Sequence, residues 1–213
     1  MTEEELREIE RQLSCPTGEN GIYVANNMNE SNISMTLASI DAMQLEAGDH
    51  LLEIGHGNCG HLTFVHEQAE NLQYTGLEIS ETMQIEAKRI NAHYPAEFLL
   101  YDGLKLPFKA NSFDKIFTVN TVYFWENAVA FIQEIERVLK KNGTFVLTFA
   151  LKQFMRELPF VDSKFALFDE EDIRQLIAHT KLRIKDTTKV FDTVISKALD
   201  EVKREFLVVT LKK

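Results

Sequence analysis

The chain has 213 residues, 45% of them hydrophobic, which suits one domain with a sizeable core and is too short for two comfortable domains. Its formal charge of −10 argues against nonspecific binding to nucleic acid or anionic lipid, since both need a basic face. The sequence holds two cysteines without a disulfide framework, and no apolar run approaches the roughly 18 residues of a membrane span. With an acidic N-terminus that lacks the apolar core of a signal peptide, these features predict a cytoplasmic protein.

The first part of the chain, residues 1–44, is expected to form a helical cap or lid on the main domain. Residues 3–13 predict a short surface helix, because their apolar side chains share one side. Residues 14–32 are rich in Gly and Asn and are expected to be irregular, and residues 26–29 fit a lid over a ligand and a plain surface loop equally well. Residues 34–43 predict a helix.

The remainder, residues 45–213, alternates predicted strands with predicted helices. A hairpin closes the chain; a turn of helix at residues 195–202 fits the spacing less well. This order predicts an α/β fold, a Rossmann-like three-layer sandwich whose seven-stranded, mostly parallel sheet has one antiparallel strand near the C-terminus. The expected strands are residues 50–54, 72–77, 96–100, 113–119, 144–150, 182–190 and 205–211. The expected helices are residues 62–69, the segment after the N-cap Ser80, a helix from residue 131 that stops at the Lys-Lys-Asn-Gly of residues 140–143, and residues 168–179.

The end of the first predicted strand carries the most informative motif, Leu-Leu-Glu-Ile-Gly-His-Gly-Asn-Cys-Gly at residues 51–60. Glycines between a strand and a helix let the backbone approach a nucleotide-like ligand closely. Glu53 precedes these glycines, and a carboxylate there disfavours a pyrophosphate but suits an ammonium or a sulfonium. The motif therefore favours S-adenosylmethionine over NAD as the ligand.

Further polar residues follow the next three strands, where ligands of open α/β sheets bind. Glu78 ends the second strand and can accept hydrogen bonds from both hydroxyls of a ribose. Asp102 ends the third strand and can accept one from an adenine amino group, and Gly103 lets the backbone come close to the ring edge. The fourth strand breaks at Asn120 into an aromatic segment.

These segments, in this order, resemble the class I S-adenosylmethionine-dependent methyltransferases, in particular the small single-domain group that includes ubiquinone- and menaquinone-biosynthesis enzymes. The resemblance covers residues 45–150. It implies that the family's glycine loop maps onto Glu53, Gly55 and Gly57, its ribose-binding acid onto Glu78 and its adenine-binding acid onto Asp102. The third glycine of the loop is replaced by Cys59. The implied cofactor-binding residues are Glu53, Gly55, His56, Gly57, Glu78, Ile79, Met83, Asp102, Gly103 and Asn120.

The resemblance implies methyl transfer from S-adenosylmethionine to a small-molecule acceptor. The expected acceptor pocket draws on residues 14–32, 123–125 and 153–168, whose aromatic side chains fit an apolar acceptor and a packed cover equally. The expected acceptor-binding residues are Tyr23, Tyr123, Phe124 and Trp125, and the weak candidates for a general base are His61, Tyr123 and Glu126. No metal is expected, because His56, Cys59 and His61 lack the spacing of a zinc site.

Two other functions remain open at the level of sequence. An NAD-dependent oxidoreductase is permitted by the glycine spacing and by Glu78, although Glu53 and Asp102 argue against it. A non-catalytic S-adenosylmethionine-binding protein is open because no base is evident and a fold does not fix a function. The acidic composition makes a nucleic acid substrate unexpected, although Lys105, Lys109 and Lys115 could form a small basic patch. The sequence leaves the oligomeric state undetermined.

Overall fold

The computed structural model describes all residues except 196–200, and its centre is a seven-stranded sheet. The strand order is β3-β2-β1-β4-β5-β7-β6, and β7 runs antiparallel to both of its neighbours. This arrangement confirms the predicted Rossmann-like sheet with one antiparallel strand. The strands are β1 (His50–Ile54), β2 (Gln73–Glu78), β3 (Ala96–Leu100), β4 (Phe113–Val119), β5 (Leu139–Ala150), β6 (Arg183–Ile195) and β7 (Glu201–Lys212).

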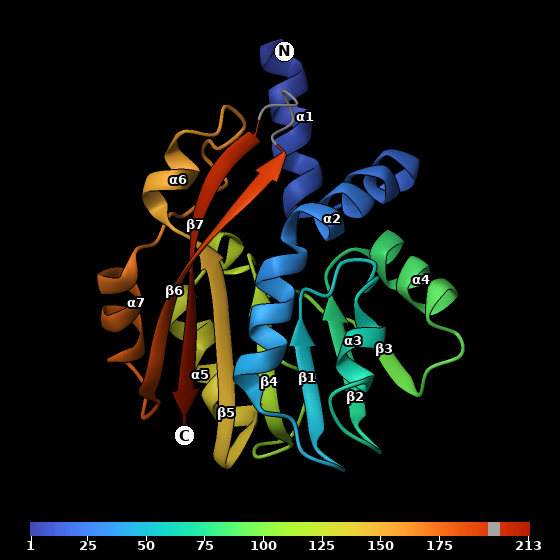
Figure 1. Ribbon diagram of the computed structural model, residues 1–213, viewed down its shortest axis with the longest axis vertical. Helices are drawn as coiled ribbons and strands as arrows, with labels where there is room; N and C mark the ends of the chain where they lie inside the picture. The colour runs from blue at the N-terminus through green and yellow to red at the C-terminus, as the bar shows by residue number, and fades with distance from the viewer. Residues whose placement is uncertain (196–200) are drawn as a thin grey trace.

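Helices cover both faces of this sheet. Figure 1 shows α2 crossing in front of the strands and α5 behind them, with α1 beyond the arrowheads of the parallel strands. Large side chains such as Phe117, Phe145 and Phe206 are fully buried in the central strands. The helices are α1 (Glu3–Ser14), α2 (Gly18–Met43), α3 (Leu62–His66), α4 (Glu81–Ile90), the 3-10 turn η1 (Val122–Phe124), α5 (Ala128–Val138), α6 (Lys152–Arg156) and α7 (Glu170–Ile177).

The cap differs most from the sequence-based expectation. Residues 14–32 were expected to be irregular, but α2 begins at Gly18 and continues without a break to Met43. Its inner face uses small residues: a Cβ at Gly21 would lie 2.7 Å from the Pro16 carbonyl carbon, and Ala25 is buried. Tertiary contacts thus override the low helix propensity of this Gly- and Asn-rich segment.

A buried cation joins this helix to the C-terminal hairpin. Arg204 of β7 is 4% exposed and pairs with Asp192 of β6. Its guanidinium also donates to the Asn32 side chain at 2.9 Å and to the Ser31 carbonyl at 2.8 Å, both in α2. The middle of α2 is therefore fixed to the end of the sheet by a group 172 residues away in sequence.

The C-terminal half confirms the hairpin and corrects one helix end. Strands β6 and β7 pair from Arg183 and Lys212 to Ile195 and Glu201. The alternative turn of helix at residues 195–202 falls partly outside the described residues, and the described part of it is strand. Residues 140–143 do not end a helix as expected, because α5 stops at Val138 and they form the start of β5, at a break in its register with β4.

Candidate functional site

The glycine turn after β1 is shaped by close packing on one side and open space on the other. Gly55 has a left-handed backbone with φ +75°, and a Cβ there would lie 2.4 Å from the Thr121 side chain. Gly57 also has φ +57°, but no heavy atom of the described residues lies within 4 Å of where its Cβ would be. The backbone at Gly57 is therefore the part of the turn that a ligand can approach.

Glu78, at the end of β2, lies directly against this turn. Its carboxylate accepts hydrogen bonds from the backbone N–H of Gly57 at 2.9 Å, of Ile79 at 2.8 Å and of Ser80 at 3.1 Å. Burial raises the pKa of Glu78, although these three N–H groups oppose the shift. The structure thus brings together the predicted ribose-binding acid and the open glycine.

Asp102, after β3, lies at the adjoining strand end. Its exposed carboxylate accepts from the N–H groups of Leu104 at 2.8 Å and Lys105 at 2.9 Å, which lower its pKa. A Cβ at Gly103 would lie 3.4 Å from Ile79, so the segments after β2 and β3 touch here. Ile79 is 40% exposed and Leu104 is 51% exposed, which leaves apolar surface between the two acids.

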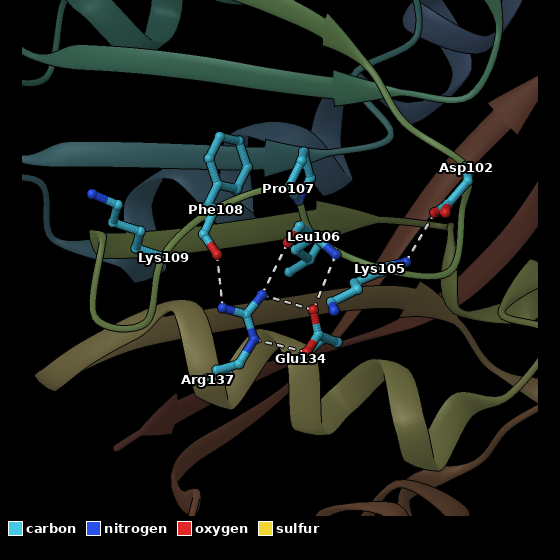
Figure 2. A pocket seen from close by; sticks show the side chains of 8 residues that line it. All are labelled: Asp102, Lys105, Leu106, Pro107, Phe108, Lys109, Glu134 and Arg137. Atoms are coloured by element: carbon cyan, nitrogen blue, oxygen red, sulfur yellow. Dashed lines mark hydrogen bonds and ion pairs between the residues drawn. The ribbon is translucent and has the colours of Figure 1, made fainter.

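An open cavity of about 590 Å³ adjoins Asp102 on the side of α5. Figure 2 shows Arg137 and Glu134 of α5 holding the loop of residues 105–109: Arg137 donates to the carbonyls of Leu106 and Phe108. Among its lining residues, Asp102 is the predicted cofactor residue. The lining residues are Asp102, Lys105, Leu106, Pro107, Phe108, Lys109, Glu134 and Arg137. Lys115 does not join a basic patch here, because its buried ammonium donates to the carbonyls of Met43 and Gln44.

Glu53 lies elsewhere than expected. Its side chain is buried beneath the glycine turn, where one carboxylate oxygen contacts His61 Nε2 at 2.9 Å and accepts from the Tyr74 hydroxyl. Burial alone would raise the pKa of Glu53, but His61 and Tyr74 hold it below its usual value. The three predicted carboxylates therefore do not all converge on one open crevice: Glu78 and Asp102 adjoin it, and a direct contact of Glu53 with a sulfonium stays a prediction.

Cys59 occupies the position that the resemblance assigns to the third glycine, and its backbone is left-handed. Its φ is +55°, and its side chain is fully buried with Sγ 3.2 Å from the Tyr74 hydroxyl. An L-residue in the left-handed region costs about 1–2 kcal/mol. The turn thus retains the glycine-like geometry, and the thiol fills space beneath it.

The aromatic segment after β4 is mostly core. The Tyr123 hydroxyl donates its one proton toward the Ala150 carbonyl at 2.8 Å, with Asn120 Oδ1 as an alternative acceptor at 3.1 Å. Burial also raises the pKa of Tyr123, which argues against it as a base. Trp125 is 8% exposed and donates to Thr121. Phe124 is half-buried against Phe165, with ring centroids 4.8 Å apart, so it alone of the three aromatics has a side chain partly open to an acceptor.

The other predicted residues divide between surface and interior. Tyr23 on α2 is 65% exposed and Glu126 is exposed, whereas Met83 is fully buried in α4. Asn120 has a left-handed backbone, and its side-chain oxygen also accepts from the Ala150 N–H at 3.2 Å. Their roles in binding stay predictions.

Asn58, a residue that the sequence analysis did not single out, links the cap to the glycine turn. Its side chain is buried, donates to Asn26 at 2.8 Å and accepts from Asn29 at 2.5 Å. Both partners belong to α2, so residues 26–29 are helical and lie against the turn. The three-residue spacing of Asn26 and Asn29, which places both on one helix face, was the available signal.

Comparison with known proteins finds similarity to methyltransferases. Residues 52–147, from β1 into β5, match the family model described as a methyltransferase domain. The chain is 25% identical over 175 residues to the methyltransferase YdaC of Bacillus subtilis, covering 76% of this chain and 94% of YdaC. It is 26% identical over 135 residues to the fatty-acid O-methyltransferase of Mycolicibacterium smegmatis, covering 63% of this chain and 49% of that protein, so it spans about half the length of this second relative.

Solved structures show the same fold. One is a chain of the complex between the Haloferax volcanii Trm112 methyltransferase activator and a methyltransferase, with TM-score 0.74, 16% identity and coverage of 88% of this chain and 92% of that one. Another is an S-adenosylmethionine-dependent methyltransferase from Mesorhizobium loti, with TM-score 0.66, 15% identity and coverage of 84% and 98%.

Among the helices that the structure describes, none is long and apolar enough to cross a bilayer. The narrower likeness to ubiquinone- and menaquinone-biosynthesis enzymes stays a prediction, as does a cytoplasmic location. The strand order, the glycine turn beside Glu78 and the family match support methyl transfer over the oxidoreductase alternative. Together these matches support a class I S-adenosylmethionine-dependent methyltransferase, with S-adenosylmethionine as the cofactor.

Proposed function

We propose that this protein transfers a methyl group from S-adenosylmethionine to a small-molecule acceptor. The observation that carries the proposal is the contact between the Gly57 N–H and Glu78, with Asp102 at the adjoining strand end. A backbone turn that is open at Gly57 and has the carboxylates of Glu78 and Asp102 beside it suits an adenosyl group, because the hydroxyls and the amino group of that ligand are hydrogen-bond donors. The names of relatives support a small acceptor, since one is a fatty-acid O-methyltransferase and another a 27-O-demethylrifamycin SV methyltransferase.

The chain's own residues supply binding and orientation. When bound, the cofactor brings a methyl group on a sulfonium that is already a good leaving group. Glu78 would hold the ribose hydroxyls with the acceptor capacity that its three backbone donors leave, and Asp102 would hold the adenine amino group. Holding the acceptor in line with the methyl carbon and excluding water provides most of the acceleration.

A general base is needed only for an acceptor such as a hydroxyl or an acidic carbon. His61 is bound to Glu53, and Tyr123 is bound to the Ala150 carbonyl, so both are already occupied within the protein. Glu126 is exposed immediately after the aromatic segment and is the remaining candidate. The half-buried rings of Phe124 and Phe165 near this point favour an acceptor with an apolar part.

Calorimetric titration with the demethylated cofactor, S-adenosylhomocysteine, tests the binding assignment. We expect binding in the micromolar range for the native chain. Loss of a hydrogen bond to a charged group costs about 1.5–3 kcal/mol, so Glu78→Ala and Asp102→Ala should each weaken binding by roughly 10- to 150-fold. Asp114→Asn is the matched control, because Asp114 lies at the opposite end of β4 and pairs with Lys140 at 2.7 Å.

Unchanged binding in both site variants would refute these assignments. Titration with NADH, followed by its fluorescence, should show no saturable binding, and saturation would favour the oxidoreductase instead. A screen of small acceptors with tritiated S-adenosylmethionine then tests transfer itself. Tight cofactor binding without transfer to any acceptor would favour a non-catalytic binding protein.

A further inference from the structure

A cluster of donor atoms lies beneath the glycine turn, outside the cofactor site described above. Glu53, Cys59 and His61 each offer one ligand atom, and these three atoms lie within 4.8 Å of one another. All three side chains are buried, with 3%, 0% and 8% exposure. Tyr74 borders the cluster, and its hydroxyl contacts both Glu53 and Cys59. A thiol, an imidazole and a carboxylate are the three ligand types that zinc uses in proteins.

A buried, ionised Glu53 carboxylate needs a compensating positive charge nearby. Glu53 is 3% exposed, and its only side-chain partners among the described residues are His61 and the Tyr74 hydroxyl. An ionised carboxylate in an apolar interior is costly unless it is paired or coordinates a metal. If His61 is neutral, the hydrogen bonds from Tyr74 and His61 leave the net charge at −1. A divalent ion with the Glu53 carboxylate and the Cys59 thiolate would bring it to zero.

A second observation comes from His56, which lies beside the cluster. Its ring lies over Gly76, where a Cβ would be 2.6 Å from the imidazole, and Gly76 is the register partner of Glu53. The ring is 3% exposed, and among the described residues neither of its nitrogens makes a hydrogen bond of good geometry, the Gly57 backbone being the nearest polar partner. A buried imidazole without such a bond is uncommon. It is a spare nitrogen donor beside the three ligand atoms.

We propose that Glu53, Cys59 and His61 form a binding site for one divalent transition-metal ion of the zinc class, outside the cofactor crevice. Zinc bonds of about 2.0–2.3 Å in a tetrahedron place donor atoms roughly 3.3–3.7 Å apart. The Glu53 carboxylate oxygen lies 2.9 Å from His61 Nε2, and all three ligand atoms lie within 4.8 Å of one another. These distances lie on either side of the tetrahedral spacing, so small side-chain rotations would bring the three atoms to it.

Binding would remove the proton of the Cys59 thiol, which leaves to solvent as the thiolate joins the metal. The Tyr74 hydroxyl stays as a donor to Glu53 and orients the carboxylate, a role that outer partners of metal ligands commonly have. The fourth position falls to His56 or to water. The ion would join the glycine turn, through Cys59 and His61, to strand β1, through Glu53, and so fix the loop on which the cofactor lies.

The metal content of untagged, full-length protein tests the proposal. After expression with added zinc and extensive dialysis, we expect about one zinc per chain by mass spectrometry. Cys59→Ser should reduce this to a trace, whereas Cys15→Ser, which removes the other, half-buried cysteine, should leave it unchanged.

Substitution with cobalt gives a readout that does not depend on the variants folding. The native chain loaded with Co²⁺ should show near-ultraviolet charge-transfer absorption from thiolate to metal, which Cys15→Ser retains. Less than a tenth of an equivalent of zinc in the native chain, or bound cobalt without the thiolate absorption, would overturn the proposal and leave a simple hydrogen-bonded Glu53–His61 pair. Binding of S-adenosylhomocysteine, measured separately, keeps this outcome distinct from a failure of the proposed function.

Discussion

Replacing Gly55 with alanine should destabilise the protein by a predictable amount. Two effects add at this position. The backbone has φ +75°, and an L-residue in the left-handed region costs about 1–2 kcal/mol. The new methyl group would also lie 2.4 Å from Thr121 Cγ2, and overpacking of this kind costs about 1–3 kcal/mol. We therefore expect the free energy of unfolding to fall by roughly 2–5 kcal/mol.

A double-mutant cycle separates the two effects. Thr121→Ser removes the methyl group that collides with the new Cβ but keeps the hydroxyl that contacts Thr118 and Trp125. In that background Gly55→Ala should cost only the backbone part, so roughly 1–3 kcal/mol of coupling is expected. Gly57→Ala is the matched control, because it shares the positive φ but meets no neighbour within 4 Å among the described residues.

Urea unfolding followed by circular dichroism and by the fluorescence of the single tryptophan gives these free energies. The reasoning fails if Gly55→Ala is no worse than Gly57→Ala. It also fails if the Thr121→Ser background does not reduce the cost, since the steric contact would then not be the cause.

The remaining predictions concern buried polar groups. Burial lowers the pKa of His56 from 6.5 to about 4. As the pH falls, the unfolded chain therefore takes up a proton before the folded chain does, and the free energy of unfolding drops between pH 6.5 and 4. His56→Leu should remove about 3 kcal/mol of that drop when unfolding is measured at several pH values in this range. Tyr74→Phe removes a donor to the buried Glu53 and should cost about 1–3 kcal/mol at pH 7, with unchanged stability contradicting the assigned hydrogen bond. Arg204→Ala should lower the free energy of unfolding by about 3–5 kcal/mol and expose α2 to proteolysis. Arg89→Ala is the control: its arginine is 68% exposed, so its loss should cost less than about 1 kcal/mol. Equal effects of the two substitutions would count against the buried Arg204–Asp192 pair as the link to α2.

The central strands were predictable because their signals are local. Both β1 and β4 have the bounds that the sequence predicts, since each is a short, mostly apolar run bounded by turn residues. The places of Glu78 and Asp102 at neighbouring strand ends were predictable, and their binding roles stay predictions from the rule that ligands of open α/β sheets bind at the carboxyl ends of strands. That rule needs only the strand ends, which a single sequence indicates well.

The cap and the surroundings of Glu53 were not predictable, because their contacts are distant in sequence. The first half of α2 buries only the small residues Gly21 and Ala25, which give no helical periodicity of large apolar residues, whereas the buried Met35, Ile40 and Met43 lie in the part that the sequence predicts as a helix. Tyr74 reaches Glu53 only through the register of β1 and β2, which pairs Glu53 with Gly76 and places Tyr74 two residues away on the same face. A one-residue shift in that register would separate them.

The departure from the family's glycine pattern and the inward position of Glu53 have a common physical consequence. A glycine at position 59 would leave the space beneath the turn unfilled, whereas the Cys59 side chain fills it and contacts the Tyr74 hydroxyl that also binds Glu53. From the other side, Asn58 binds α2 through Asn26. A loop held from both sides loses less conformational entropy when it binds a ligand, so the local strain at Cys59 is offset by preorganisation of the backbone that faces the cofactor.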